Sequence, residues 1–183
     1  MSIDFDGVIL IYIITVGIFA FTSCLKRRSL LSLRERFPKT IAGIYGSMVV
    51  GITLCPVELP PQKSVYSMAQ LVNMIPFADL MQEEINWLNV FGNIALFITL
   101  IPLWQYGVSK KDWTLKKSIV VSGLVSITIE TLQLAENISG LSGIMGRQVD
   151  ITDIFYNIIG GAIGYIAIAG YRKVCSKKGE RKV

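Results

Sequence analysis

Five apolar runs, at residues 7–25, 40–57, 87–106, 118–136 and 154–171, dominate the sequence. An α-helix rises about 1.5 Å per residue, so about 20 residues cross a hydrocarbon core of roughly 30 Å. The chain is 52% hydrophobic and 17% charged, with a mean hydropathy of +0.54. These features predict an all-α, polytopic membrane protein with five transmembrane helices, organised as a single domain over residues 1–183.

The basic residues predict how these helices are oriented. All but two of the 18 lysines and arginines lie after the first, third or fifth run. By the positive-inside rule, the N-terminus is outside the cell and the C-terminus inside. Asp4 and Asp6 precede the first run and Lys26 follows it, the reverse of a cleaved signal peptide. The net charge of +5 therefore reflects membrane orientation, and we expect no nucleic-acid partner.

The composition excludes several kinds of chemistry. The chain has no histidine, which rules out Ser-His-Asp or Cys-His catalysis and any His-ligated metal. On the predicted topology Cys24 and Cys175 are cytoplasmic and Cys55 is near the outer side, so no disulfide framework is expected. We expect no cofactor.

Polar residues recur at the outer ends of three runs. They are Asn86, Asn89 and Asn93; Ser126, Glu130, Gln133 and Asn137; and Asp150, Asp153 and Asn157. Spacings of three and four residues place each set on one helix face. Asn93, Glu130 and Asn157 each lie seven residues inside the outer member of their set, a depth of about 10 Å.

A carboxylate at that depth costs at least about 2.5–3.5 kcal/mol on insertion scales, so the three faces should share one polar pocket. We predict that Asn93, Glu130, Gln133 and Asn157 line this pocket. Arg147, Asp150 and Asp153 are expected at its mouth. Arg147 would contact anionic groups, and the acidic residues would bond hydroxyls, amides or amines.

A structural interpretation exists for each of these groups. Arg147, Asp150 and Asp153 could instead form an ion-paired cap of the fifth helix. Asn93 and Asn157 could form hydrogen bonds between helices, and Glu130 could be a hydrogen-bonded packing residue. A structural role is also expected of Gly160, Gly161 and Gly164, because glycines favour close helix packing. Glu130, Asp150 and Asp153 carry oxygens suited to a hard cation, but we expect no metal.

Residues 58–86 are too apolar for a solvated loop. We expect an extracytoplasmic helical segment, with two short helices broken at Pro76. Irregular backbone at that depth must be covered by protein or water. Asn73, Pro76 and Phe77 mark the break.

Four motifs together resemble the VanZ-like family. They are Asn73-x-x-Pro76-Phe77; Gly92-Asn93-x-x-Leu96-Phe97; Glu130-x-x-Gln133; and Arg147-x-x-Asp150-Ile151-x-Asp153-x-x-x-Asn157-x-x-Gly160-Gly161-x-x-Gly164. Their order and spacing fit over residues 43–171. One departure is that Thr99 and Ile101 stand where the family usually has Pro and Gly, and Pro102 comes later.

The resemblance implies a multi-pass protein of the bacterial plasma membrane. The family is associated with reduced susceptibility to teicoplanin-type lipoglycopeptides, by a route distinct from remodelling the D-Ala-D-Ala terminus. Our leading hypothesis is that the pocket binds a lipid-linked headgroup, such as a cell-wall precursor, or the lipoglycopeptide itself. Membrane lipids are the other expected partners.

Two other hypotheses stay open. The chain could be an intramembrane enzyme with Glu130 as general base and Asn93 or Asn157 polarising a carbonyl or phosphoryl oxygen. It could also be a structural or export partner whose polar residues only join helices. The sequence makes no prediction of oligomeric state.

Overall fold

The structure, a computed structural model, describes residues 33–55, 57–81, 85–109 and 112–180. The elements in chain order are α2 (Leu33–Leu54), α3 (Met68–Leu71), β1 (Val72–Asn73), η2 (Ala78–Met81), α4 (Trp87–Trp104), η3 (Gln105–Ser109), α5 (Leu115–Ser139), β2 (Val149–Asp150) and α6 (Ile151–Glu180). The predicted first span, residues 7–25, lies outside the described residues.

Four helices in the described part, α2, α4, α5 and α6, are long and apolar enough to cross a membrane. They correspond to the predicted spans 40–57, 87–106, 118–136 and 154–171. Only 11% to 33% of the residues in each span are buried, so most of their side chains are at least partly exposed, as in a protein surrounded by lipid. The fold is mostly helical, as predicted.

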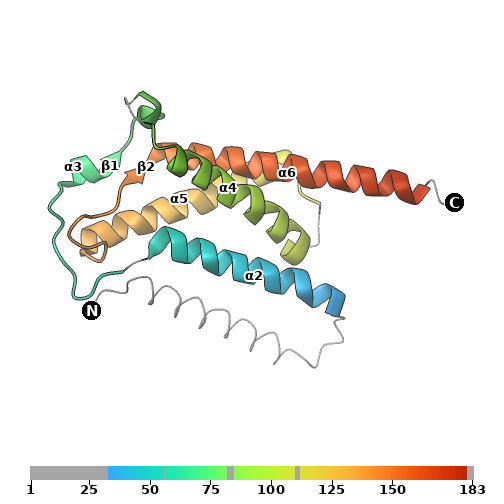
Figure 1. The fold of residues 1–183 in the computed structure, drawn as a ribbon, viewed down its shortest axis with the longest axis horizontal. Helices are drawn as coiled ribbons and strands as arrows, with labels where there is room; N and C mark the ends of the chain where they lie inside the picture. The colour runs from blue at the N-terminus through green and yellow to red at the C-terminus, as the bar shows by residue number, and fades with distance from the viewer. Residues whose placement is uncertain (1–32, 56, 82–84, 110–111, 181–183) are drawn as a thin grey trace.

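The four helices alternate in direction (Figure 1). The ends of α2 and α5 and the starts of α4 and α6 lie at one end of the bundle, where β1 and β2 pair in parallel. We call this the β end. At the opposite end Arg172 forms an ion pair with Asp112, and the ammonium of Lys117 lies 4.9 Å from the centre of the Trp113 ring. The orientation of this bundle in the membrane stays a prediction from the charge rule.

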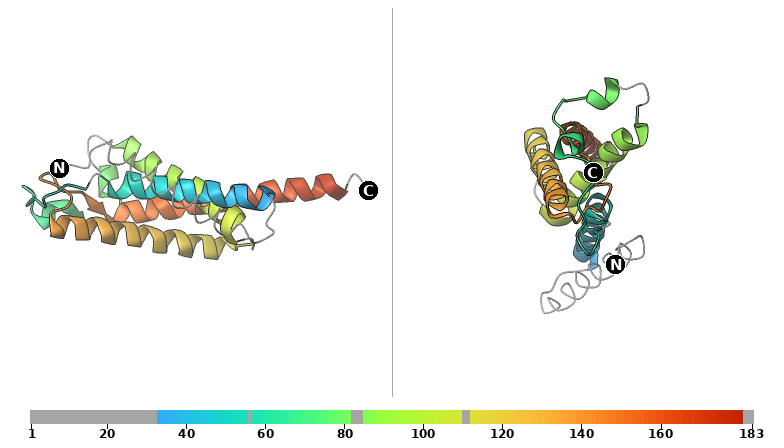
Figure 2. Two further views of the ribbon diagram at one scale, coloured as in Figure 1. Left: turned by 90° about the horizontal axis from the view of Figure 1, so that it is seen from below. Right: turned by 90° about the vertical axis from the view of Figure 1, so that its left-hand side faces the viewer.

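Two helices extend beyond the predicted spans. α2 begins at Leu33 rather than at residue 40, and α6 continues from residue 171 to Glu180. Arginine, lysine and glutamate have good helix propensity, so a helix continues where its apolar run stops. As a result α6 projects past the other helices at its C-terminal end (Figure 2).

The prediction for residues 58–86 is only partly correct. The described residues of this segment contain two short helices of a single turn each, α3 and η2, on either side of the break at Pro76. The preceding stretch is irregular and bonds to the loop after α5. The N–H groups of Glu58, Gln62 and Val65 donate to the carbonyls of Leu141, Gly140 and Ile144, at 2.8, 2.9 and 2.8 Å.

Gly140 makes this contact possible. It ends α5 in the left-handed region, with φ of 74°, and a Cβ there would lie 2.6 Å from the carbonyl oxygen of Gln62. A larger residue would therefore suffer both backbone strain and a clash. Sequence patterns did not indicate this pairing because it joins two irregular segments far apart in the chain.

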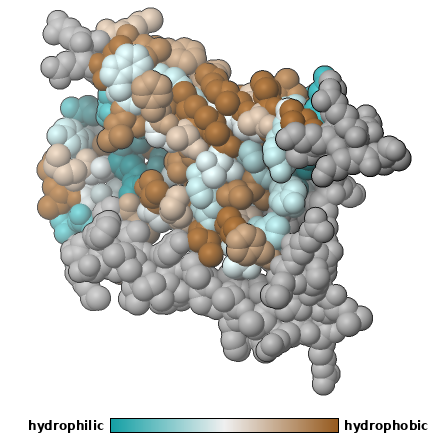
Figure 3. Space-filling model, turned by 45° about the vertical axis from the view of Figure 1, so that its right-hand side comes forward, coloured by the Kyte–Doolittle hydropathy of each residue, from teal (hydrophilic) through white to brown (hydrophobic). Residues whose placement is uncertain are grey.

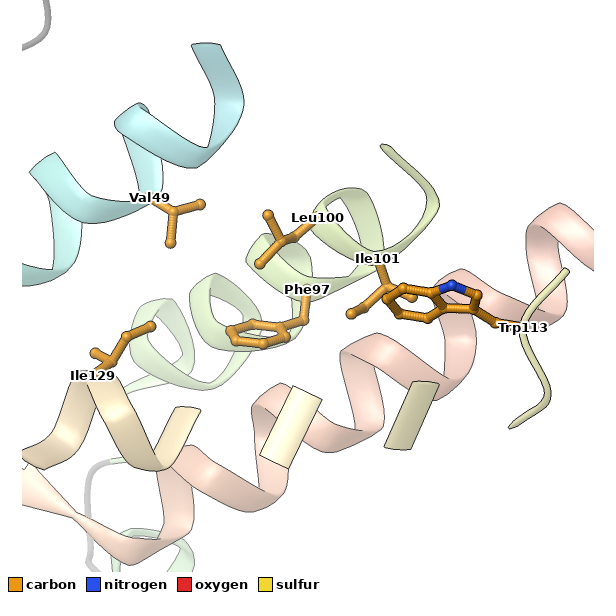
Figure 4. Packing of buried hydrophobic residues seen from close by; sticks show 6 residues of the cluster. All are labelled: Val49, Phe97, Leu100, Ile101, Trp113 and Ile129. Carbon is orange, nitrogen blue, oxygen red and sulfur yellow. The ribbon is translucent and has the colours of Figure 1, made fainter. Parts of the chain in front are cut away.

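The apolar core lies between the helices, in the interior of the bundle. It consists of Val49, Phe97, Leu100, Ile101, Trp113 and Ile129 (Figure 4). Phe97 is completely buried and lies between Ile129 of α5 and Ile101 (Figure 4). The Tyr45 hydroxyl donates to the carbonyl of Leu96 at 3.0 Å and so ties α2 to α4.

α6 packs against α4 through glycine. A Cβ on Gly164 would lie 2.6 Å from the carbonyl oxygen of Ile98, and a Cβ on Gly160 would overlap the carbonyl of Ile94. The two backbones can therefore approach each other only because these side chains are missing. Small residues four apart are a common way to bring membrane helices together.

The adjacent face of α6 packs against a row of serines. A Cβ on Gly161 would overlap the hydroxyl of Ser122. Ser118, Ser122 and Ser126 recur every four residues on α5 and are all completely buried. α6 is thus held between α4 and α5, and its polar residues are placed at a fixed height against both.

We predict that Gly160→Ala lowers the free energy of unfolding by about 1–3 kcal/mol, because the added methyl group meets rigid backbone. The measurement is denaturant unfolding of purified protein in detergent micelles. Gly170→Ala is the matched control, since nothing lies within 4 Å of its Cβ position. Equal stability of the two variants would contradict the close contact.

Candidate functional site

A cavity of about 300 Å³ lies between α2, α4, α5 and α6 towards the β end. It is lined by Ile52, Thr53, Asn89, Gly92, Asn93, Leu96, Phe97, Ile129, Glu130, Gln133, Arg147, Gln148, Asp153 and Asn157. We call it the polar cavity. Figure 3 shows a hydrophilic hollow set among apolar side chains on one face of the molecule. The structure thus brings together Glu130 and all the predicted ligand-binding residues except Asp150.

Asn157 carries the most unusual group of this cavity. Its side chain is 3% exposed, and its amide nitrogen donates to the hydroxyl of Ser126 at 2.8 Å. Its amide oxygen has no hydrogen-bond partner in the described part of the chain. A buried acceptor without a partner costs about 1–3 kcal/mol, so such a group is usually satisfied by a water or a ligand.

Glu130 lies on the α5 wall of the polar cavity and is 7% exposed. One of its oxygens accepts the backbone N–H of Asp150 at 3.1 Å. No other donor to this carboxyl group is found among the described residues. The bond joins α5 to the start of α6, and it leaves the second oxygen for an occupant of the cavity.

Asp150 lies outside the lining of the polar cavity and has a structural position. One carboxylate oxygen accepts the N–H of Thr152 at 2.7 Å, the geometry of an N-cap on α6. The other accepts the side-chain amide of Asn73 at 2.8 Å. The same two residues are partners in the β1–β2 pair. Of the two predicted roles for Asp150, this geometry favours the cap.

The Asn73, Pro76 and Phe77 motif closes the β end over the start of α6. The oxygen of the Asn73 side chain accepts the N–H of Ile75 at 3.1 Å and so tightens the turn before Pro76. Phe77 has a positive φ of 60° and donates its N–H to the hydroxyl of Thr152 at 2.9 Å. Its ring packs 5.3 Å from that of Phe155, which fixes the segment against α6.

Asparagines on α4 form the third wall. The amide of Asn89 donates to the carboxylate of Asp153 at 3.0 Å, and the amide of Asn93 donates to the oxygen of Asn89 at 3.3 Å. This short chain of bonds joins α4 to α6 at the edge of the polar cavity. It holds Asp153 in the lining of the polar cavity.

Arg147 is held by the protein itself. Its guanidinium donates to the carbonyl of Thr53 at the end of α2, and its Nε lies 3.7 Å from a carboxylate oxygen of Glu136. Gln133 donates to the same Thr53 carbonyl at 2.8 Å. The predicted contact between Arg147 and an anionic ligand would have to share a guanidinium that is already engaged on two sides.

The backbone of Arg147 is equally fixed. The side chain of Asn137 accepts its N–H at 2.8 Å and donates to its carbonyl at 2.6 Å, as a neighbouring strand would. Asn137 is 5% exposed, so both bonds lie in a protected environment. The loop therefore returns from α5 to α6 along one defined path.

Sequence reasoning missed three groups at this site: the carbonyl of Thr53, Glu136 and Thr152. A signal existed for Thr53, because the last four carbonyls of every helix need partners from outside it. Glu136 and Thr152 carried none, since neither belongs to a recognisable polar spacing.

Other candidate chemistry is sparse at this end. Cys55, just past the end of α2, is a half-buried free cysteine. No group of three or more Cys, Asp or Glu residues placed to hold a metal occurs within residues 33–55, 57–81, 85–109 and 112–180.

These features define a class: a multi-pass membrane protein with a closely packed helix bundle and a polar cavity at one end. The family follows from the sequence comparison. A model of the VanZ/LLP1 family matches residues 42–172, most of the chain, so the chain belongs to that family. This confirms the resemblance drawn from the four motifs. No curated protein and no solved structure gives a significant match.

A double-mutant cycle tests the structural position of Asp150. We predict that Asp150→Ala and Asn73→Ala each destabilise the protein and that their effects are not additive. The expected coupling is about 0.5–3 kcal/mol, because the two side chains share one charge-assisted bond. The free energy of unfolding is measured in detergent micelles for the unmodified protein, the two single variants and the double variant. Additive effects within about 0.5 kcal/mol would show that this bond is absent in solution.

Proposed function

We propose that this protein binds the polar headgroup of a lipid-linked cell-envelope molecule, or a teicoplanin-type lipoglycopeptide, in the polar cavity. Binding there would reduce susceptibility to such antibiotics by shielding the precursor or sequestering the drug. Membership of the VanZ/LLP1 family supports the link to the cell envelope. By the charge rule the cavity faces the outer leaflet of the plasma membrane, where these molecules are found.

The observation that carries the proposal is the unpartnered amide oxygen of Asn157 beside an open cavity. Helices joined only for stability would be expected to satisfy every buried polar group, because lipid offers no hydrogen bonds. Five buried side-chain atoms have no hydrogen-bond partner in the described chain, and the Asn157 oxygen is the one among them whose residue lines the polar cavity. The Glu130 carboxyl also has a second oxygen without a donor among the described residues. Hydroxyl and amide groups of a sugar–peptide headgroup are suitable donors for both.

The cavity also has the size and composition of a ligand site. Its volume of about 300 Å³ is at the lower end of the range for small-molecule pockets. Amide and carboxyl groups from α4, α5 and α6 converge on it, while Phe97 and Ile129 provide apolar surface. Such a mixture favours a group that is polar but not uniformly charged.

Gly92 allows the proposal to be tested without disturbing the helix contacts. It lines the polar cavity, and nothing lies within 4 Å of its Cβ position. We predict that Gly92→Leu fills the cavity and removes teicoplanin tolerance in cells that depend on this protein. The measurement is the inhibitory concentration of teicoplanin, with membrane abundance followed by immunoblotting.

Gly170→Leu is the matched control, because Gly170 also has open space around it but lies outside the polar cavity. It should leave tolerance unchanged. Unchanged tolerance with Gly92→Leu, at normal abundance, would contradict the proposal. Arg147→Ala is a poorer test, since Arg147 also holds the end of α2.

A second candidate function is an intramembrane enzyme acting on the same class of molecule. The observation in its favour is Glu130 on the cavity wall, whose carboxyl group is 7% exposed and has one oxygen without a donor among the described residues. It could act as general base on a bound substrate. Asn157 could then polarise the reacting group through its amide.

Mass spectrometry of lipid-linked precursors incubated with purified protein separates the two functions. If the protein only binds, we expect the precursors to be recovered unchanged, and Glu130→Gln to alter affinity alone. Turnover that disappears in Glu130→Gln but persists in Gly170→Leu would instead establish the enzyme.

A further inference from the structure

The polar cavity has an apolar continuation. A groove of about 400 Å³ lies between α2, α4 and α5, and Thr53 and Ile129 line both spaces. We call it the apolar groove. The remaining walls include Gly46 and Val50 of α2, Trp104 of α4 and Leu132 of α5.

On each helix that the two spaces share, the groove extends further from the β end than the polar cavity does. On α4 the polar cavity uses residues 89–97 and the groove uses residues 100–104, further from the β end. On α5 the cavity uses residues 129–133, whereas the groove continues back to Val121. On α2 the groove likewise extends back to Gly46. A polar space near the membrane surface therefore leads to an apolar space at greater depth.

The groove offers no free hydroxyl group to an occupant. Its two threonines, Thr53 and Thr128, donate their hydroxyls to the carbonyls of Val49 and Leu124 on their own helices, both at 2.8 Å. Between Val121 and Leu132 the α5 wall is about 17 Å long, comparable with half of a hydrocarbon core of roughly 30 Å. These dimensions suit one lipid chain.

In the described part of the chain the groove is open at its side. Val50 is 51% exposed and Leu132 is 44% exposed, on the two helices that flank the groove. Gly46 adds no side chain to close the gap and has nothing within 4 Å of its Cβ position. A chain could enter sideways from lipid, with its headgroup following into the polar cavity.

We infer that the apolar groove and the polar cavity form one binding site for a membrane lipid, with an acyl chain in the groove and the headgroup in the cavity. This inference rests on the proposed headgroup binding and adds the class of ligand: an amphiphile taken from the bilayer rather than from water. The apolar groove then contributes burial of hydrocarbon, and the polar cavity contributes hydrogen bonds.

Photolabelling of the full chain in vesicles tests this inference. The vesicles contain phosphatidylglycerol and phosphatidylethanolamine, with a trace of phosphatidylglycerol or diglucosyl diacylglycerol whose acyl chain carries a diazirine. After irradiation, labelled residues are mapped by mass spectrometry. We expect at least one probe to label the groove walls around Val50 and Leu132 several-fold more than Ile166, which is 61% exposed on α6.

Gly46→Leu should reduce groove labelling several-fold, and Leu132→Trp should do so from the other wall. Gly92→Leu should reduce it as well, because the headgroup loses its place, and Gly170→Leu should leave it unchanged. Labelling no stronger than at Ile166 with both probes would overturn the inference, as would labelling that survives Gly46→Leu and Leu132→Trp.

Gly92→Leu separates this inference from the proposed function. Groove labelling that survives Gly92→Leu, together with loss of teicoplanin tolerance, would overturn the single site while leaving the headgroup proposal standing. Groove labelling that Gly92→Leu removes, together with unchanged tolerance, would support the lipid site and contradict the antibiotic role.

Discussion

A polar group at the depth of the hydrocarbon core must find its partner within the protein, because lipid supplies none. This constraint sets the arrangement of α5 and α6. The Glu130 carboxyl accepts the N–H of Asp150, and the amide of Asn157 donates to Ser126 one turn deeper. These bonds work at short range, so they require the close approach that Gly161 permits. Packing and polar pairing therefore depend on each other along the same face.

Much of the architecture could be predicted from the sequence, for reasons that are physical. The length of each apolar run indicates directly whether it can span a membrane. Four of the predicted spans are found as helices in the described chain. The depth of Asn93, Glu130 and Asn157 could be predicted because a helix converts residue count into height. Their convergence on one cavity follows from the cost of leaving them in lipid.

The roles of individual polar residues were harder to predict. Asp150 and Arg147 share the spacing of the cavity residues, yet their side chains bond mainly to Asn73 and to the carbonyl of Thr53. Both partners lie far away in the chain: Asn73 is in an irregular segment, and Thr53 is in the last turn of α2. A local pattern cannot indicate a pairing that depends on how distant segments meet. The path of residues 58–65 along the loop after α5 was missed for the same reason.

The Thr53 carbonyl has one more consequence. It accepts from both Gln133 and Arg147, so one oxygen atom joins the end of α2 both to α5 and to the loop before α6. Moving the tip of α2 outward would release an amide and a guanidinium at the same moment. The same two hydrogen bonds therefore set both the separation of α2 from α5 and the number of donors that are free to bind a ligand.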